Sequence, residues 1–207
     1  MRLWLPLLIV LCASHTPALA EVRDTSPGYF RYPALGPDSI VFTAEGDLWR
    51  VSLRGGLAQR LTTHPGEEAH AAISPDGEMV AYSASYEGPT EVYTMRLDGG
   101  APRRLTYEGE SAQVVGWSAT GDILYSTRRH AGLPGVHLAR LDPVTARSTL
   151  LPLAQASDGD IDATGTVVFF TRFPFQGSFT KRYAGGTAQS IWTYTAGDDE
   201  ARPLTAG

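Results

Sequence analysis

The stretch Ser74–Leu105, SPDGEMVAYSASYEGPTEVYTMRLDGGAPRRL, decides the fold of this chain. It begins with a Ser-Pro-Asp-Gly turn, in which Pro75 presets one backbone angle and Gly77 tolerates a positive φ. Two runs of β-forming residues follow, separated by Gly88-Pro89, and each has the length of one strand. Asp98-Gly99-Gly100 then turns the chain again. The pattern is typical of a meander of antiparallel hairpins.

The same pattern recurs with a period of 44 residues, counted from Gly56 to Gly100. An Arg-Leu-Thr motif at 60–62 returns at 104–106, and Arg-Pro-Leu-Thr closes the fourth copy at 202–205. Weaker turns mark the third and fourth copies at 118–121 and 162–165. This spacing, with 11 extra residues inserted before the last copy of the position, assigns four residues to one repeat position, where we expect packing between repeats rather than ligand binding: Trp49, Tyr93, His137 and Trp192.

Each copy contains four strand-like segments, expected in the second copy at His70–Ser74, Met79–Ser85, Glu91–Leu97 and Pro102–Thr106. Four strands per repeat of this length is the pattern of a β-propeller, whose blades bury their faces only against neighbouring blades. A β-sandwich is the alternative, but it gives no reason for a constant period. The sequence therefore predicts an all-β fold of four blades, each with four antiparallel strands.

The expected blades cover residues 29–62, 67–106, 111–153 and 158–205. Propellers have about four to eight blades, and most have more than four. We therefore expect residues 21–207 to be an incomplete propeller, part of a six-bladed ring in a longer protein.

The first 20 residues have the features of a secretory signal peptide. Arg2 precedes a short apolar run that ends at Cys12, and Ala18-Leu19-Ala20 matches a cleavage site. The run is too short to span a bilayer. Lipid attachment at Cys12 is an alternative, which the large Leu11 before it disfavours. We expect an exported protein, periplasmic or secreted, with no membrane span after the signal is removed.

Charge and cysteine content narrow the class of protein further. The single cysteine leaves with the signal peptide, so the mature chain forms no internal disulfide, which a bacterial periplasm permits. Loss of Arg2 changes the formal net charge from −5 to −6. This acidic balance argues against nucleic acid as a partner. No cofactor is predicted.

Several segments resemble known families. Residues 61–106 resemble the TolB-like PD40 propeller repeat, which is WD40-like and occurs widely. The opening GYFRYPALGPDSIVFTAEGDLWRV (28–51) and the segment TKRYAGGTAQSIWTY (180–194) are more specific. Both resemble the N-terminal six-bladed propeller of tricorn-type serine proteases, the S41 peptidase family. The resemblance covers residues 28–205, nearly all of the mature chain.

This resemblance implies a large serine peptidase that acts on oligopeptides. In that family a second propeller, a PDZ module and the catalytic domains follow later in the chain. The family's catalytic positions lie in those later domains, so no catalytic residue is assigned here. The resemblance also implies assembly into a homo-oligomer.

Residues that could suggest chemistry within this chain fit structural roles better. Ser118 lies in Gly-Trp-Ser-Ala-Thr-Gly, whose spacing differs from the G-x-S-x-G elbow of hydrolases. A second group, of two histidines and two glutamates, could suggest a zinc site. It lacks the H-E-x-x-H spacing of such sites, and Pro65-Gly66 excludes the helix that this motif requires. For this group we expect a solvated loop or a hydrogen-bonded link between blades: His64, Glu67, Glu68 and His70.

Asp158, Asp160 and Asp162 begin like a calcium loop. Ala163 and Phe169 stand where the EF-hand pattern requires Gly at position six and Glu at position twelve. Asp162 also aligns with the turn residue Ser74. We therefore predict a turn here and no metal site in the chain.

The inserted segment between Arg172 and Gln189 is the strongest candidate for function. Long loops within a compact fold are commonly functional, and aromatic and arginine residues are enriched at interfaces. We predict a peptide path or an interface here; the alternative is a loop that packs on its own blade. The candidate residues are Arg172, Phe173, Phe175, Phe179, Lys181, Arg182 and Tyr183.

The sequence thus predicts a non-catalytic propeller portion of an exported tricorn-like peptidase. It would act as a channel or gate for peptides, or as a docking scaffold for the downstream protease domains of the same chain. The alternative is a TolB-like periplasmic propeller that binds a protein partner without enzymatic activity. A third reading is the propeller cap of a prolyl-oligopeptidase-type hydrolase, which a G-x-S-x-G motif would follow.

Overall fold

The computed structural model describes residues 28–132, 135–174, 185–186 and 188–205, and every structural statement below concerns these residues. They form sixteen β-strands in four separate four-stranded sheets. No helix in these ranges is long and apolar enough to cross a membrane.

Each sheet is built from four consecutive strands. The first contains β1 (Arg31–Leu35), β2 (Ser39–Ala44), β3 (Asp47–Ser52) and β4 (Gln59–Arg60). The second contains β5 (Glu68–Ile73), β6 (Met79–Ala84), β7 (Glu91–Arg96) and β8 (Arg103–Arg104). The third contains β9 (Ala112–Trp117), β10 (Ile123–Thr127), β11 (His137–Leu141) and β12 (Ser148–Leu150). The fourth contains β13 (Asp158–Ile161), β14 (Val167–Thr171), β15 (Ile191–Thr195) and β16 (Arg202–Pro203).

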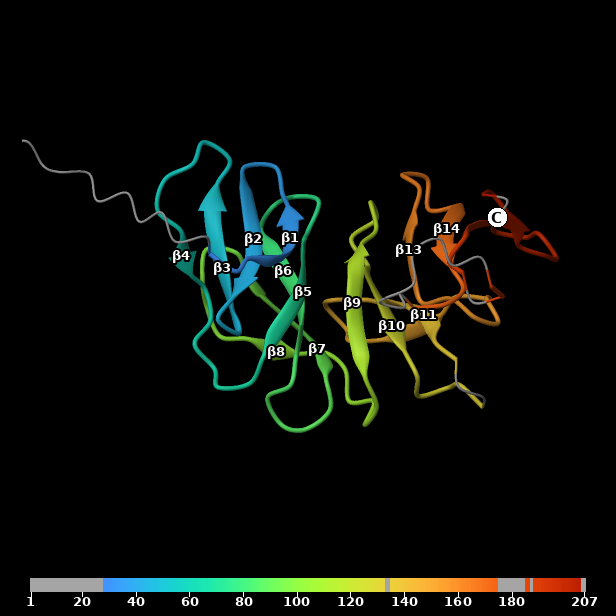
Figure 1. The fold of residues 1–207 in the computed structure, drawn as a ribbon, viewed down its shortest axis with the longest axis horizontal. Coiled ribbons are helices and arrows are strands. Elements are labelled where there is room, and N and C mark those ends of the chain that lie inside the picture. Colours follow the sequence, from blue (N-terminus) through green and yellow to red (C-terminus); the bar gives the residue numbers. More distant parts are fainter. Residues whose placement is uncertain (1–27, 133–134, 175–184, 187, 206–207) are drawn as a thin grey trace, which may run out of the picture.

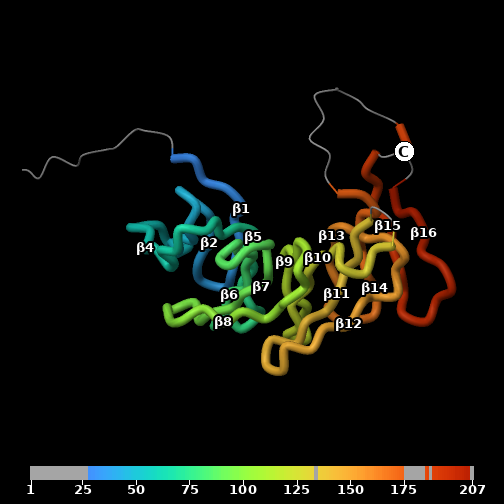
Figure 2. Tube along the Cα trace, turned by 90° about the horizontal axis from the view of Figure 1, so that it is seen from below, coloured from blue at the N-terminus to red at the C-terminus, as the bar shows by residue number. Residues whose placement is uncertain are grey.

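All neighbouring strands pair antiparallel and in chain order, which confirms the predicted blades of four strands. The four blades follow one another along an arc (Figure 1). Seen in Figure 2, the first strand of every blade lies on the inner side of this arc, and β4, β8, β12 and β16 lie on the outer side. The inner strands also touch in sequence, β1 with β5, β5 with β9 and β9 with β13. They form a continuous inner wall.

The Ser-Pro-Asp-Gly turn is held by its own side chains. Ser74 Oγ accepts a hydrogen bond from the Met79 N–H at 2.9 Å and donates one to Asp76 Oδ1 at 2.5 Å. Ser118 and Asp162 accept the equivalent backbone bond in the third and fourth blades. Different side chains therefore serve the same turn, which is why the turn stays recognisable while its sequence varies.

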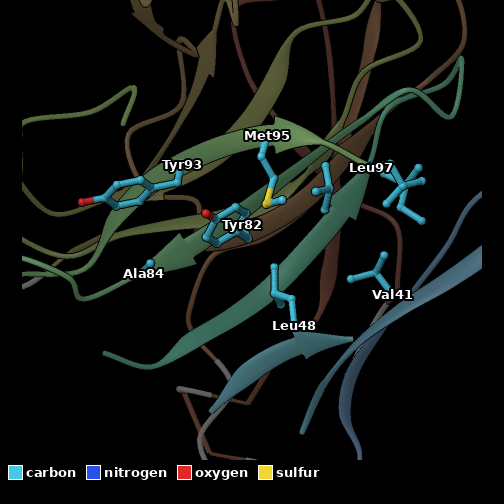
Figure 3. Close-up of a cluster of buried hydrophobic side chains, with 9 residues drawn as sticks. Val41, Leu48, Tyr82, Ala84, Tyr93, Met95 and Leu97 are labelled. Carbon is cyan, nitrogen blue, oxygen red and sulfur yellow. The ribbon is translucent and has the colours of Figure 1, made fainter. Parts of the chain in front are cut away.

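The second and third blades each contribute side chains to two cores. In β6, Val80 and Tyr82 belong to a cluster shared with the first blade, whereas Ala81 belongs to one shared with the third. Successive side chains of a strand point to opposite faces, so β6 is buried on both. Figure 3 shows the first cluster, where Val41 and Leu48 of the first blade face side chains of the second. The constant period follows from this stacking of equal units.

The Arg-Leu-Thr motif ties the last strand of a blade to the strand before it. In the second blade, Thr106 Oγ1 accepts a hydrogen bond from the Val92 N–H at 2.8 Å, and the Leu105 N–H donates to the Val92 carbonyl at 2.8 Å. Thr62 accepts the equivalent bond from the Leu48 N–H at 2.8 Å. Thr205 accepts the equivalent bond from the Ile191 N–H in the fourth blade, so the motif is a structural closure of three of the four blades; Pro152 takes the place of the threonine in the third.

The spacing inferred for the third repeat is wrong by two residues. Tyr82 pairs with Tyr93 in the second blade, and the equivalent Tyr125 pairs with Ala139, not with His137. The cause is a change of loop length, because the β10–β11 connection (128–136) is longer than the β6–β7 connection (85–90). Counting at a constant period cannot detect such a change.

Candidate functional site

The base of the inserted segment lies directly after β14. Gln189 Nε2 donates a hydrogen bond to the Phe173 carbonyl at 3.0 Å, and this contact joins the two ends of the segment. Thr171 Oγ1 donates to the same carbonyl at 3.4 Å. Of the seven residues predicted for this site, the structure places Arg172 and Phe173. The other five lie outside the described residues: Phe175, Phe179, Lys181, Arg182 and Tyr183.

Arg172 lies over two aromatic rings at this base. Its guanidinium carbon is 5.1 Å from the ring centre of Trp192 and 5.7 Å from that of Phe173. A guanidinium at this distance is attracted to the face of an aromatic ring. Arg172 and Trp192 line a groove of about 360 Å³ beside the fourth blade, and Asp199 and Glu200 also belong to its lining. This groove can accept an aromatic or a cationic side chain.

A larger cavity, of about 680 Å³, opens at the inner wall. Tyr32 of β1, His70 of β5, Gln113 of β9 and Asp158 of β13 all line it, so each described blade contributes one of these side chains. Pro174, at the base of the inserted segment, also lines it. The lining combines hydroxyl, amide, imidazole and carboxyl groups with an aromatic ring. Such a wall can hydrogen-bond an extended polar chain.

Two of the lining residues have unusual backbone conformations. Tyr32 and His70 have φ of 50° and 51°, in the left-handed region that side chains with a Cβ rarely adopt. Both lie where the register of the inner strand shifts against its neighbour, as in a β-bulge. Strain of this kind costs about 1–3 kcal/mol per residue and clusters at functional sites. The bulges bring the two rings to within 4.0 Å of each other.

His70 lies among groups from four blades. Burial lowers the pKa of its imidazole, and Arg31 lowers it further, whereas Asp158 and Glu67 raise it. Gln113 Nε2 lies 3.5 Å from His70 Nδ1. The ring is thus held mainly in its neutral form, in which one nitrogen donates and the other accepts a hydrogen bond.

The structure separates the histidines and glutamates that the sequence places close together. His64 stacks on Tyr86 with ring centres 4.0 Å apart, Glu67 pairs with Arg31 at 2.9 Å, and Glu68 is buried between two blades. The segment therefore forms a link between blades, which is one of the two roles that the sequence predicted for it. Within the described ranges, no three His, Cys, Asp or Glu side chains are close enough to hold a metal ion.

Ser118 and Asp162 both serve turns. Asp122 N–H donates to Ser118 Oγ at 3.0 Å. Asp162 accepts backbone bonds from Thr166 and Val167, and the bond from Thr164 Oγ1 is the largest factor that lowers the pKa of its carboxyl. Both residues therefore have the structural role in a turn that the repeat predicted.

Sequence reasoning did not identify the inner-wall cluster. Its members are far apart in the chain and meet only through blade packing. In β1 the bulge is marked by Pro33, but β5 carries no glycine or proline at the equivalent place. A polar residue inside an otherwise apolar first strand, such as His70, was the available signal.

Antiparallel four-stranded blades arranged with their first strands innermost define a β-propeller. The chain belongs to the family of the tricorn protease N-terminal β-propeller domain, whose family model matches residues 27–207. This confirms the resemblance seen in the sequence. The tricorn protease homolog 1 of Streptomyces coelicolor is 34% identical over 185 residues, which cover 88% of this chain and 17% of the homologue.

Solved structures share the same fold. The crystal structure of the tricorn protease matches with a TM-score of 0.75 and 22% identity, over 87% of this chain and 18% of that chain. A putative TolB from Agrobacterium tumefaciens matches with a TM-score of 0.71 and 22% identity, over 88% of this chain and 64% of that chain. The chain therefore spans less than a fifth of the tricorn homologue and of the tricorn protease chain named here.

Proposed function

We propose that this chain is the non-catalytic propeller of an exported tricorn-like serine peptidase, and that its inner wall forms part of a passage for extended oligopeptides. The observation that carries the proposal is the cavity of about 680 Å³ lined by residues from all four described blades. The catalytic groups would lie in other domains of the same protein.

The chemistry of the wall suits a peptide in transit. Gln113 and Ser126 offer groups that can bond a peptide backbone, and Tyr32 offers an aromatic face. Asp158 and Arg128 place opposite charges on the same lining. A ring of blades around such a wall would admit an extended chain and exclude a folded one. We propose a six-bladed ring for the complete propeller.

The groove at Arg172 supports a docking role beside the passage. The groove places the Arg172 guanidinium over Trp192, and arginine and tryptophan are residue types enriched at protein interfaces. We propose that another domain of the same protein, or a second copy in an oligomer, binds here.

Export rests on the first 20 residues, which have the features of a signal peptide. The test is cell fractionation of the tagged protein with sequencing of its N-terminus. A periplasmic or secreted protein that begins at Glu21 is expected. A cytoplasmic protein that keeps Met1 would contradict export.

The passage is tested by narrowing it in the full-length protein. Gln113→Trp and Ser126→Trp would add bulk to the wall, and Gln59→Trp on the exposed outer strand β4 is the matched control. Cleavage of fluorogenic peptides of increasing length is then measured. We expect kcat/KM to fall for long peptides and to change little for the shortest, with the control unchanged.

Equal cleavage of all lengths by wild type and both wall variants would overturn the passage. A full-length protein that cleaves no peptide, is unaffected by serine-directed inhibitors and captures a protein partner would favour the TolB-like binding propeller instead.

A further inference from the structure

Glu68 lies at the seam between the first and second blades and is fully buried. Its backbone N–H donates to the Gly46 carbonyl of the first blade at 2.8 Å. Its carboxyl accepts hydrogen bonds from Thr62 Oγ1 at 2.6 Å and from the Tyr86 hydroxyl at 2.7 Å. Thr62 closes the first blade and Tyr86 follows β6, so one carboxyl holds both blades.

A second buried carboxyl shares this seam. The Asp47 side chain is 4% exposed, and its Oδ2 pairs with Arg60. Its Oδ1 is buried and has no hydrogen-bond partner. An unpaired buried carboxylate oxygen is unfavourable, and a second negative charge nearby makes the seam more so. Arg60 pairs with Asp47, whereas the bonds to the Glu68 carboxyl come from the uncharged hydroxyl groups of Thr62 and Tyr86.

The seam between the second and third blades is arranged differently. Glu91 takes the place of Asp47 there, and its Oε1 accepts hydrogen bonds from Arg104 at 3.0 Å and from the Glu108 N–H at 2.8 Å. Ala112 takes the place of Glu68 at the start of the inner strand, so that seam has one buried carboxyl instead of two. The charge of the Glu91 carboxylate is compensated within the seam by Arg104.

We propose that the seam between the first and second blades is a proton-operated junction, which tightens when Glu68 binds a proton and loosens when Glu68 loses it. The groups that face Glu68 are Asp47 from β3, His64 from the connection before β5, and Tyr86 after β6, with Tyr82 behind Tyr86. A proton on Glu68 removes the excess negative charge and supplies a donor that the acidic pair lacks.

The direction of the effect follows from the surroundings. Burial raises the pKa of Glu68, and the charge of Asp47 raises it further, against the opposing bonds from Thr62 and Tyr86. A pKa higher in the closed seam than in the open one means that closure is favoured below the open-state value, about 4.3. Closure is then lost as the pH rises through the closed-state pKa.

The test is hydrogen exchange of the Glu68 amide, which bonds across the seam, in the intact protein between about pH 4 and 8. After correction for the intrinsic pH dependence of exchange, the opening constant of wild type should rise by up to about tenfold per pH unit and then level off. Glu68→Gln should show no such rise. Glu91→Gln is the matched control and should keep the wild-type pH dependence at the first seam.

Equal pH dependence in wild type and Glu68→Gln would overturn the proposal, as would protection that increases with pH. Carbon-13 NMR of labelled glutamate in the wild type gives a second measurement that needs no variant. We expect one buried carboxyl, assigned to Glu68, to titrate above the ordinary value of about 4.3. Titration at or below that value would also overturn the proposal.

Discussion

Removal of the buried Glu91 carboxyl should destabilise the propeller far more than removal of an exposed carboxyl that binds the same arginine. Glu91 is 1% exposed and contacts Arg104 at 3.0 Å, whereas Glu87 is 75% exposed and contacts Arg104 at 3.1 Å. The two substitutions, Glu91→Ala and Glu87→Ala, share the partner Arg104 and differ in the burial of the carboxyl and in the further hydrogen bonds that Glu91 accepts. They form a matched pair.

The magnitude follows from the groups left without an acceptor. Glu91 accepts bonds from Arg104, from Thr106 Oγ1 at 2.5 Å, and from the backbone N–H groups of Glu108 and Gly109. Breaking a buried ion pair from one side costs about 3–5 kcal/mol, because the remaining charge stays buried. An exposed pair contributes about 0–1 kcal/mol. The difference between the two variants should therefore exceed about 2 kcal/mol.

Urea unfolding followed by tryptophan fluorescence measures this difference. Trp117 is a suitable reporter, because its indole N–H donates to the Ala72 carbonyl across the seam between the second and third blades at 2.8 Å. The midpoint should fall strongly for Glu91→Ala and little for Glu87→Ala, with similar slopes. Equal losses in the two variants would refute the argument that burial, and not the ion pair itself, sets the cost.

Three further outcomes are expected. Glu45→Asn should stabilise the protein by up to about 1 kcal/mol in the same unfolding assay, because Glu45 and Gly46 both have positive φ, and Asn-Gly suits that hairpin turn; a loss of stability would contradict this. Gly159→Ala should cost about 1–3 kcal/mol, since the added Cβ would lie 2.4 Å from the Phe169 carbonyl oxygen of the next strand; Gly186→Ala, where nothing lies within 4 Å, is the control. Asp158→Asn should lower the pKa of His70 further, because Asp158 raises it; the loss of stability on acidification would still begin near the unfolded value of about 6.5, but it would continue to lower pH and become larger. Proton NMR titration of His70 measures this, and a rise in its pKa would contradict the assignment.

The blade architecture could be predicted because its physical requirements repeat. Every blade needs the same kind of turn and the same strand alternation, and three of the four blades close with a threonine, Thr62, Thr106 or Thr205, so these features recur along the chain. Prediction failed where loop length changed, as with His137, because a constant period assumes equal loops. Strand ends also moved: β5 begins at Glu68 rather than His70, and β8 is limited to Arg103–Arg104, since the following residues bond β7 through a closing side chain.

The candidate site was predictable only in part, for a different reason. The inserted segment is visible as extra length, and its base does lie beside both an aromatic groove and the inner cavity. The inner wall itself is assembled from one or two residues of each blade. Its members, such as Tyr32 and Asp158, are brought together by the curvature of the arc, which no local pattern encodes.

The two carboxyl seams show why equivalent repeat positions need not be interchangeable. Asp47 and Glu91 occupy the same place in successive blades, yet they differ by one methylene group. The longer Glu91 reaches the backbone N–H groups of the next connection, where the half-buried Glu108 bonds Tyr125 and Thr127 of the third blade. The shorter Asp47 leaves one oxygen without a partner, and Glu68 of the following blade accepts the bond from the closing threonine instead. The seam with the shorter acid thus carries two fully buried carboxyls and the seam with the longer acid carries one, and we expect the two seams to respond differently to pH.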